Sequence, residues 1–188
     1  MNSVIPMADK DESTDMRRPM PRQPVPELDL PLAGGGRFKF SENQPELLTM
    51  ILFYRGVHCP VCSRQLGELQ ARIADFSALG VEVVAISMDT AERANRARAE
   101  WDVNGIPLAY DLSEDKAGEF GLYISSARGD HELARFSEPA LFLVNPDQTL
   151  FGASIQTMPF TRPPFDELLQ GLRYVKEHGY PARGEVPA

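Results

Sequence analysis

Two short apolar runs with a helical pattern between them constrain the fold of this chain more than any other feature. Residues 47–54 are almost wholly apolar and residues 81–88 are rich in β-branched side chains, as strands buried on both faces of a sheet are. Between the runs, apolar residues recur at helical spacing, at Leu66, Leu69, Ile73 and Phe76. The order strand, helix, strand predicts an α/β domain.

The remaining patterns extend this unit into a mixed central sheet flanked by helices. Further strands are expected at residues 37–40, 108–110, 140–144 and 150–154. Further helices are expected at residues 91–101, 114–120 and 165–177. The last two strands are joined by a hairpin-type connection with the sequence Asn145-Pro146-Asp147-Gln148. The chain shows no internal repeat and no second domain.

The N-terminal residues differ in composition from the rest of the chain. Residues 1–25 mix charged side chains with several prolines and bury little, so we expect a flexible arm. The folded domain is then expected to span residues 26–188. Residues 1–10 lack the basic flank and apolar stretch of a secretory signal peptide, which makes a cytoplasmic protein the expectation.

The overall charge bears on the partners of the chain. Nineteen Lys and Arg face twenty-seven Asp and Glu, which gives a net charge of -8. This acidic balance argues against a nucleic-acid surface, which needs clustered positive charge, and against an anionic membrane face. A small uncharged substrate or a protein partner fits better.

The chain has only two cysteines, Cys59 and Cys62, and the predicted fold gives them a particular place. A buried strand ends at Tyr54, a short loop follows, and Pro60 begins a helix that Gly80 ends. Cys59 is therefore expected at the amino end of a helix, where unpaired N–H groups and the helix dipole favour thiolate. Cys62, one turn further on, can attack a mixed disulfide or a sulfenic acid on Cys59.

Simpler explanations of the cysteine pair are two ordinary buried thiols, a structural disulfide and a metal site. A disulfide that closes so short a loop adds little stability. Structural zinc usually needs four Cys or His ligands, and the histidines of this chain are scattered, at His58, His131 and His178. We therefore expect a redox pair with no metal and no nucleotide cofactor. His58 and Arg55 could add positive charge beside it.

The order strand, Cys59-Pro60-Val61-Cys62, helix resembles the thioredoxin superfamily. That resemblance implies a thioredoxin-like fold. It also implies that Pro139, which precedes the strand at 140–144, is a cis-proline facing the cysteine pair. Without the resemblance, Pro139 would be only a proline at the start of a strand, where the missing N–H is tolerated.

A closer resemblance covers about residues 26–184. Residues 53–62 (FYRGVHCPVC), 80–89 (GVEVVAISMD), 106–111 (IPLAYD) and 158–163 (MPFTRP) are similar to the peroxiredoxin-like branch of the alkyl hydroperoxide reductase/thiol-specific antioxidant (AhpC/TSA) family. This resemblance implies an antioxidant thiol peroxidase regenerated by an external thiol reductant such as a thioredoxin, glutaredoxin or glutathione. Members often associate, so a homodimer is also considered.

One departure from the family pattern concerns the peroxide site. Typical members have a Pro seven residues and a Thr or Ser three residues before the peroxidatic cysteine, whereas this chain has Leu52 and Gly56 before Cys59. The resemblance also implies an arginine that stabilises the thiolate. Arg55 is the nearest in sequence and the candidate we favour, while Arg135 and Arg162 could approach through folding.

Three functional hypotheses follow from these patterns. In the first, the Cys59 thiolate attacks a hydroperoxide and Cys62 then resolves the sulfenic acid. In the second, the same pair acts on protein or glutathione disulfides as a thioredoxin-like thiol-disulfide oxidoreductase. In the third, the chain is a non-catalytic binding or regulatory module, whose function would survive Cys59→Ser.

Overall fold

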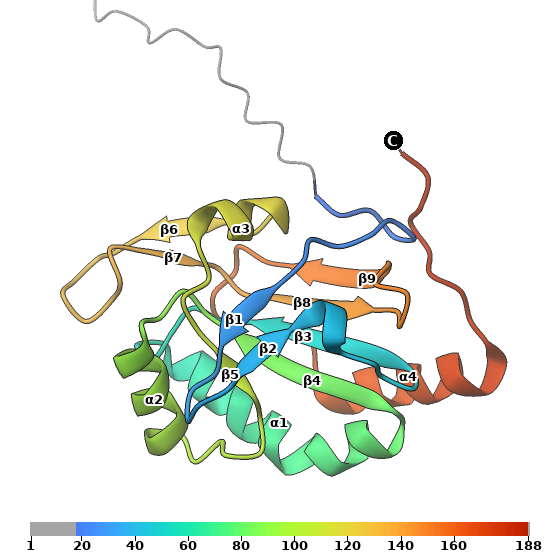
Figure 1. Cartoon of the computed structure of the whole chain (residues 1–188), viewed down its shortest axis with the longest axis horizontal. Helices are drawn as coiled ribbons and strands as arrows, with labels where there is room; N and C mark the ends of the chain where they lie inside the picture. The colour runs from blue at the N-terminus through green and yellow to red at the C-terminus, as the bar shows by residue number, and fades with distance from the viewer. Residues whose placement is uncertain (1–17, 188) are drawn as a thin grey trace, which may run out of the picture.

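The computed structural model describes residues 18–187, which form a mixed sheet with helices on its two faces (Figure 1). The five-stranded sheet has the order β5-β4-β3-β8-β9. Its strands are β3 (Leu48–Phe53), β4 (Val81–Ile86), β5 (Leu108–Ala109), β8 (Ala140–Val144) and β9 (Leu150–Ile155). Strands β3, β4 and β5 are parallel, whereas β8 runs antiparallel to both β3 and β9. The predicted mixed sheet and the hairpin between the last two strands are therefore confirmed.

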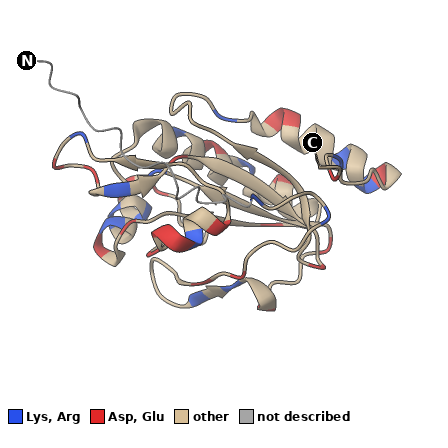
Figure 2. Cartoon of the chain, turned by 90° about the horizontal axis from the view of Figure 1, so that it is seen from above, with Lys and Arg blue, Asp and Glu red and all other residues tan. Residues whose placement is uncertain are grey.

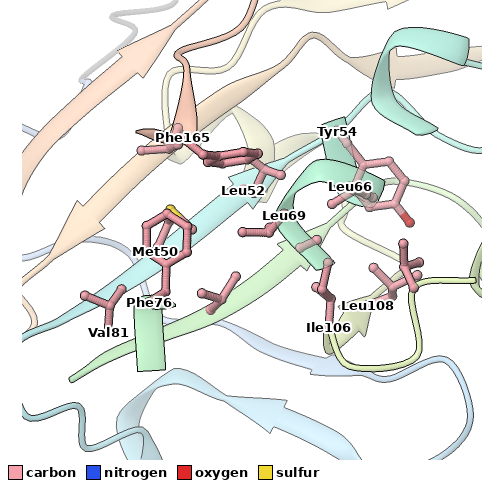
Figure 3. Close-up of a cluster of buried hydrophobic side chains, with 14 of the residues drawn as sticks. Met50, Leu52, Tyr54, Leu66, Leu69, Phe76, Val81, Ile106, Leu108 and Phe165 are labelled. Atoms are coloured by element: carbon pink, nitrogen blue, oxygen red, sulfur yellow. The ribbon is translucent and has the colours of Figure 1, made fainter. Parts of the chain in front are cut away.

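Alternating side chains of β3 separate two cores, because successive residues of a strand point to opposite faces of the sheet. Met50, Leu52 and Tyr54 pack on one face against α1 (Pro60–Ala78) and α4 (Phe165–His178) (Figure 3). Phe53 lies on the other face and packs against Phe120 and Phe142, with ring centroids 5.1 and 5.6 Å away. Every residue of β3 is buried, Thr49 included, as its almost wholly apolar sequence predicts.

The second face of the sheet is covered by smaller elements. This core receives buried side chains from β1 (Asp29–Pro31), a 3-10 turn (Phe40–Glu42) and α3 (Glu114–Glu119). The strand β2 (Arg37–Lys39) pairs with β1, and its Phe38 packs against the same core. The helix α2 (Ala91–Glu100) instead lies near β5 on the first face, where its buried Ala94 joins the core of Met50 and Leu52. Lys, Arg, Asp and Glu are interspersed over several elements rather than gathered by sign (Figure 2).

The helices begin and end where the local chemistry allows. The Thr90 side chain accepts the Arg93 N–H and the Ser113 side chain accepts the Lys116 N–H, so each caps the helix that follows it. The C-terminal helix α4 ends at Gly179, whose φ of 60° is the left-handed conformation typical of a helix C-cap. Of the helices described, none is long and apolar enough to cross a membrane.

Two sequence-based expectations need correction. Strands β1, β6 (Ile124–Ser126) and β7 (Arg135–Ser137) were not predicted. The chain is also attached to the fold before residue 26, because the Arg22 N–H donates to Leu150 O at 2.8 Å and the Val25 N–H donates to Gln148 O at 3.0 Å. Residues 1–17, where the rest of the expected arm falls, lie outside the described residues.

Candidate active site

Cys59 lies where the sequence predicts, at the start of α1 and beyond the carboxyl end of β3. It is the N-cap residue of α1, and Pro60 follows at the first helical position, where its missing N–H leaves nothing unpaired. The Cys62 backbone N–H donates to Cys59 Sγ at 3.3 Å. The sulfur thus takes the place of the usual capping oxygen and lies at the positive end of the helix dipole.

The two sulfur atoms are in direct contact. The Cys62 thiol donates a hydrogen bond to Cys59 Sγ, with 2.7 Å between the sulfurs. Both cysteines are free thiols and belong to the core between the sheet and α1. Cys59 is 2% exposed and Cys62 is 0% exposed. One sulfur can therefore reach the other without movement of the helix.

The environment separates the two thiols in acidity. The pKa of Cys59 is lowered to about 6, and the hydrogen bond from the Cys62 thiol is the largest cause. The Cys62 N–H and the charges of Arg55 and Arg162 lower this pKa further, whereas burial raises it. Burial raises the pKa of Cys62 well above its ordinary value, and its hydrogen bond to Cys59 raises it further. Cys59 is therefore the thiolate at neutral pH and Cys62 the thiol.

Arg55 stands near the pair but is shared with carboxylates. Its Nε lies 3.3 Å from Glu138 Oε2, its Nη2 lies 4.0 Å from Glu132 Oε1, and its guanidinium stacks 4.8 Å from the centre of the Phe136 ring. Its charge helps to lower the pKa of Cys59. The two carboxylates reduce the positive potential that it adds to the pocket.

His58 does not supply the positive charge that its position suggests. Burial, followed by the neighbouring charge of Arg55, lowers the pKa of His58 below its ordinary value. The ring packs against Phe136, with centroids 4.8 Å apart, and Arg93 Nη2 lies 3.4 Å from His58 Nδ1. His58 is therefore neutral at pH 7, and the charges near the cysteines come from arginines.

Arg162 is the arginine that approaches a cysteine sulfur. It lies in the loop between β9 and α4, where its Nη2 donates to Cys62 Sγ at 3.4 Å and its Nε donates to Gln65 Oε1 at 2.9 Å. Arg135, the other distant candidate, instead forms an exposed ion pair with Glu114. Folding thus brings one of the two distant arginines to the pair.

Pro139 lies at the predicted edge of the sheet but not in the predicted conformation. Ala140 pairs with Phe53, so Pro139 is placed beside the end of β3, and it lines a small cavity together with Gln65 and Arg162. No cis peptide bond occurs in the described residues, so the expected cis-proline is wrong. Two backbone hydrogen bonds hold the chain between β7 and β8: the Glu138 N–H donates to Tyr123 O, and the Gln156 N–H donates to Pro139 O.

Asp89 organises the cysteine loop, a role that sequence reasoning missed. Its buried carboxylate accepts the Val57 N–H at 2.7 Å and the Arg93 Nε–H at 2.6 Å. Gly56 has a φ of 130°, and a Cβ there would lie 2.8 Å from Asp89 Oδ1. The cap of α2 is the next residue, Thr90. The sequence signal for Asp89 was a carboxylate directly after a buried strand.

The site offers sulfur and guanidinium groups rather than a metal-binding cluster. Within residues 18–187, no group of three or more His, Cys, Asp or Glu side chains is placed to hold a metal ion. What the arrangement provides is a thiolate at a helix N-terminus, a second thiol in contact with it and two arginines nearby.

Comparisons with known proteins bear on the family and the fold of the chain. The model of the AhpC/TSA family matches residues 21–151. Similar solved structures include the peroxidoxin BcpB from Mycobacterium tuberculosis, with 18% identity, a TM-score of 0.69 and coverage of 84% of this chain and 99% of that one. The AhpC of Enterococcus faecalis has 20% identity, a TM-score of 0.68 and coverage of 86% and 97%. Among curated proteins, no relative matches the chain.

A third similar structure, peroxiredoxin 6 of Arenicola marina, has 18% identity, a TM-score of 0.70 and coverage of 83% of this chain and 73% of that one. These likenesses confirm the predicted thioredoxin-like fold. The family match spans well over half of the chain and indicates a thiol-dependent peroxidase. The chain belongs to the AhpC/TSA family and is of the peroxiredoxin type.

Proposed function

We propose that this protein reduces hydroperoxides, with Cys59 as the attacking thiolate and Cys62 as the resolving thiol. The observation that carries the proposal is the contact between the two sulfurs, 2.7 Å apart, in which the thiolate is Cys59. Family membership supplies the class of substrate. The low pKa of Cys59 supplies the nucleophile, because a thiolate and not a thiol attacks an O–O bond.

The chemistry balances with these two residues and one external reductant. The Cys59 thiolate attacks the terminal oxygen of the hydroperoxide, the O–O bond breaks, and an alcohol or water leaves as Cys59 becomes a sulfenic acid. Cys62 attacks that sulfur, so that an S–S bond forms, the S–O bond breaks and water leaves. A thioredoxin, a glutaredoxin or glutathione then donates two electrons and restores both thiols.

Other residues of the loop position the pair for this reaction. Asp89 fixes the Val57 N–H and hence the turn before Cys59. In this proposal Arg55 contributes charge to the thiolate, and Pro139 lines the site beside Gln65 and Arg162. A free pair of this kind fits a reducing compartment such as the cytoplasm, and a homodimer remains a prediction.

A thiol-disulfide oxidoreductase is the second candidate, and one observation favours it. Leu52 and Gly56 occupy the positions where typical relatives carry a proline and a hydroxyl residue, so no hydroxyl precedes Cys59 by three residues to orient a peroxide. The same low-pKa thiolate would then attack a disulfide, and Cys62 would release the mixed disulfide. The third hypothesis, a binding module without catalysis, is not retained, because the family match indicates a thiol-dependent peroxidase.

The test compares two classes of substrate, peroxides and a disulfide, on one protein. The reduced chain is mixed with hydrogen peroxide, with an alkyl hydroperoxide and with oxidised glutathione, and the loss of Cys59 thiol is followed by mass analysis. We expect peroxide to react far faster than it does with a free thiol, and Cys59→Ser to abolish the reaction. Slow peroxide reaction with rapid disulfide reduction would select the second candidate.

A further inference from the structure

Arg162 differs from the other arginines around the active site in having no acidic partner among residues 18–187. Arg55 faces Glu138 and Glu132, and Arg93 is paired with the buried Asp89. For Arg162, no carboxylate of residues 18–187 lies within ion-pair distance. Its charge is therefore free to act on the sulfur beside it, because no neighbouring anion neutralises it.

Neutral oxygen atoms hold the Arg162 guanidinium in a fixed direction. The Nε–H donates to Gln65 Oε1 at 2.9 Å, and Nη1 donates to Pro159 O at 3.0 Å and to Thr161 O at 2.6 Å. These bonds leave Nη2 directed at Cys62 Sγ, 3.4 Å away. Since a guanidinium is planar and rigid, the three neutral acceptors also fix the position of the fourth contact.

Cys62 is the residue that needs such help. It is fully buried, and burial raises the pKa of its thiol, so few molecules carry the Cys62 thiolate at neutral pH. Resolution nevertheless requires that thiolate, because it is the species that attacks sulfur. Once Cys59 is a sulfenic acid, the negative charge of Cys59 is gone, and Arg162 remains in contact with Cys62.

We propose that Arg162 is a catalytic residue of the resolution step, in which its Nη2 stabilises the Cys62 thiolate as that sulfur attacks the sulfenic acid on Cys59. The inference rests on the proposed function. The S–S bond forms, the S–O bond of the sulfenic acid breaks, and the departing hydroxide combines with the proton given up by Cys62 to leave as water. Gln65 is a positioning residue, because it acts only through Arg162.

The proposal assigns the two arginines to different steps. Arg162 contacts Cys62 and so serves mainly resolution, whereas Arg55 acts through its charge on the Cys59 thiolate, to which the charge of Arg162 also contributes. Replacing Arg162 should therefore slow disulfide formation more than sulfenic acid formation. A merely structural role would slow both steps alike and would leave their pH dependence unchanged.

The experiment measures the two steps separately in single turnovers with hydrogen peroxide, with a sulfenic acid trap to time each species. Arg162→Gln should slow conversion of sulfenic acid to disulfide by about tenfold to a hundredfold, the effect of losing a hydrogen bond to a charged group. The pH profile of that step should also move to higher pH. Arg162→Lys should recover part of the rate, and Arg135→Gln, the same type of change at an exposed ion pair, should leave both steps as in the wild type.

A second measurement tests the contact without any peroxide. In a Cys59→Ser background the Cys62 thiolate is titrated by its ultraviolet absorbance, and Arg162→Gln should raise the midpoint. A midpoint unmoved by this change, or an unchanged rate of resolution, would overturn the assignment of Arg162 alone. Wild-type protein that forms no sulfenic acid with peroxide would instead overturn the proposed function, and the resolving role with it.

Discussion

Replacing Gly56 with alanine should destabilise the fold and disturb the loop that presents Cys59. The backbone φ of Gly56 is 130°, a conformation that costs about 1–3 kcal/mol for a residue with a side chain. The new Cβ would also lie 2.8 Å from Asp89 Oδ1 and 3.0 Å from Oδ2. The carboxylate cannot move away easily, because it already accepts hydrogen bonds from Val57 and Arg93.

The magnitude follows from these two effects. Backbone strain and the close contact together should lower the free energy of unfolding by about 2–4 kcal/mol. Gly67 is the matched control, because it lies within α1 and a Cβ there meets nothing within 4 Å outside the nearby backbone of its own helix. Gly67→Ala should raise the free energy of unfolding by about 0.5–1 kcal/mol, since glycine weakens a helix interior.

Urea unfolding of the reduced proteins tests the pair of variants. With a slope of about 2–3 kcal/mol per M for a domain of this size, Gly56→Ala should lower the midpoint by about 1 M, while Gly67→Ala should raise it slightly. The rate of Cys59 alkylation should also fall in Gly56→Ala. A midpoint equal to that of the wild type would refute the reasoning, because it would mean that the loop adopts another conformation without loss.

Two further predictions concern the core and the thiolate. Phe76→Ala should lower the free energy of unfolding by about 3–5 kcal/mol, because its buried ring packs edge-on against Phe165. Phe160→Ala, at an exposed position, should change the free energy of unfolding by less than about 0.5 kcal/mol. Equal shifts of the two urea midpoints would contradict the assigned core. The alkylation rate of Cys59 should rise with pH around a midpoint near 6, since its lowered pKa keeps the thiolate where a free thiol is protonated, and Cys62→Ala should move the midpoint upward. The free energy of unfolding that this thiolate contributes should be lost as the pH falls through about 6, the lowered pKa of Cys59. An alkylation midpoint near that of a free thiol, about 8.5, would contradict the assigned hydrogen bond.

Strands β3, β4 and β8 of the central sheet were predictable because each is a short, mostly apolar run. Strand β8 was predicted with its observed bounds, Ala140–Val144, since Pro139 precedes it and Asn145 follows it. Strands β6 and β7 were missed because each has only three residues, with serine or arginine among them, and they pair only with each other. Such a hairpin is defined by contacts across a loop rather than by a local pattern.

Some active-site residues were likewise predictable from local patterns, whereas others come close only through folding. Cys59 and Cys62 were predictable because strand, loop and helix succeed one another along the chain, so local patterns place both sulfurs. Arg162 lies 100 residues beyond Cys62, and only the packing of its loop against α1 brings the two together. Arg55 was favoured for its closeness in sequence, but the sequence alone does not show that Glu138 and Glu132 fold against it.

The most direct test of the central claim is to identify the cysteine that peroxide oxidises first. Reduced Cys62→Ala and Cys59→Ser proteins are treated with stoichiometric hydrogen peroxide in the presence of a sulfenic acid trap, and the adducts are mapped by peptide mass analysis. If Cys59 is the nucleophile and Cys62 resolves it, the first variant carries the adduct on Cys59, the second carries none, and the wild type forms the internal disulfide. An adduct on Cys62 in the Cys59→Ser protein, formed as fast as that on Cys59, would contradict the assigned roles.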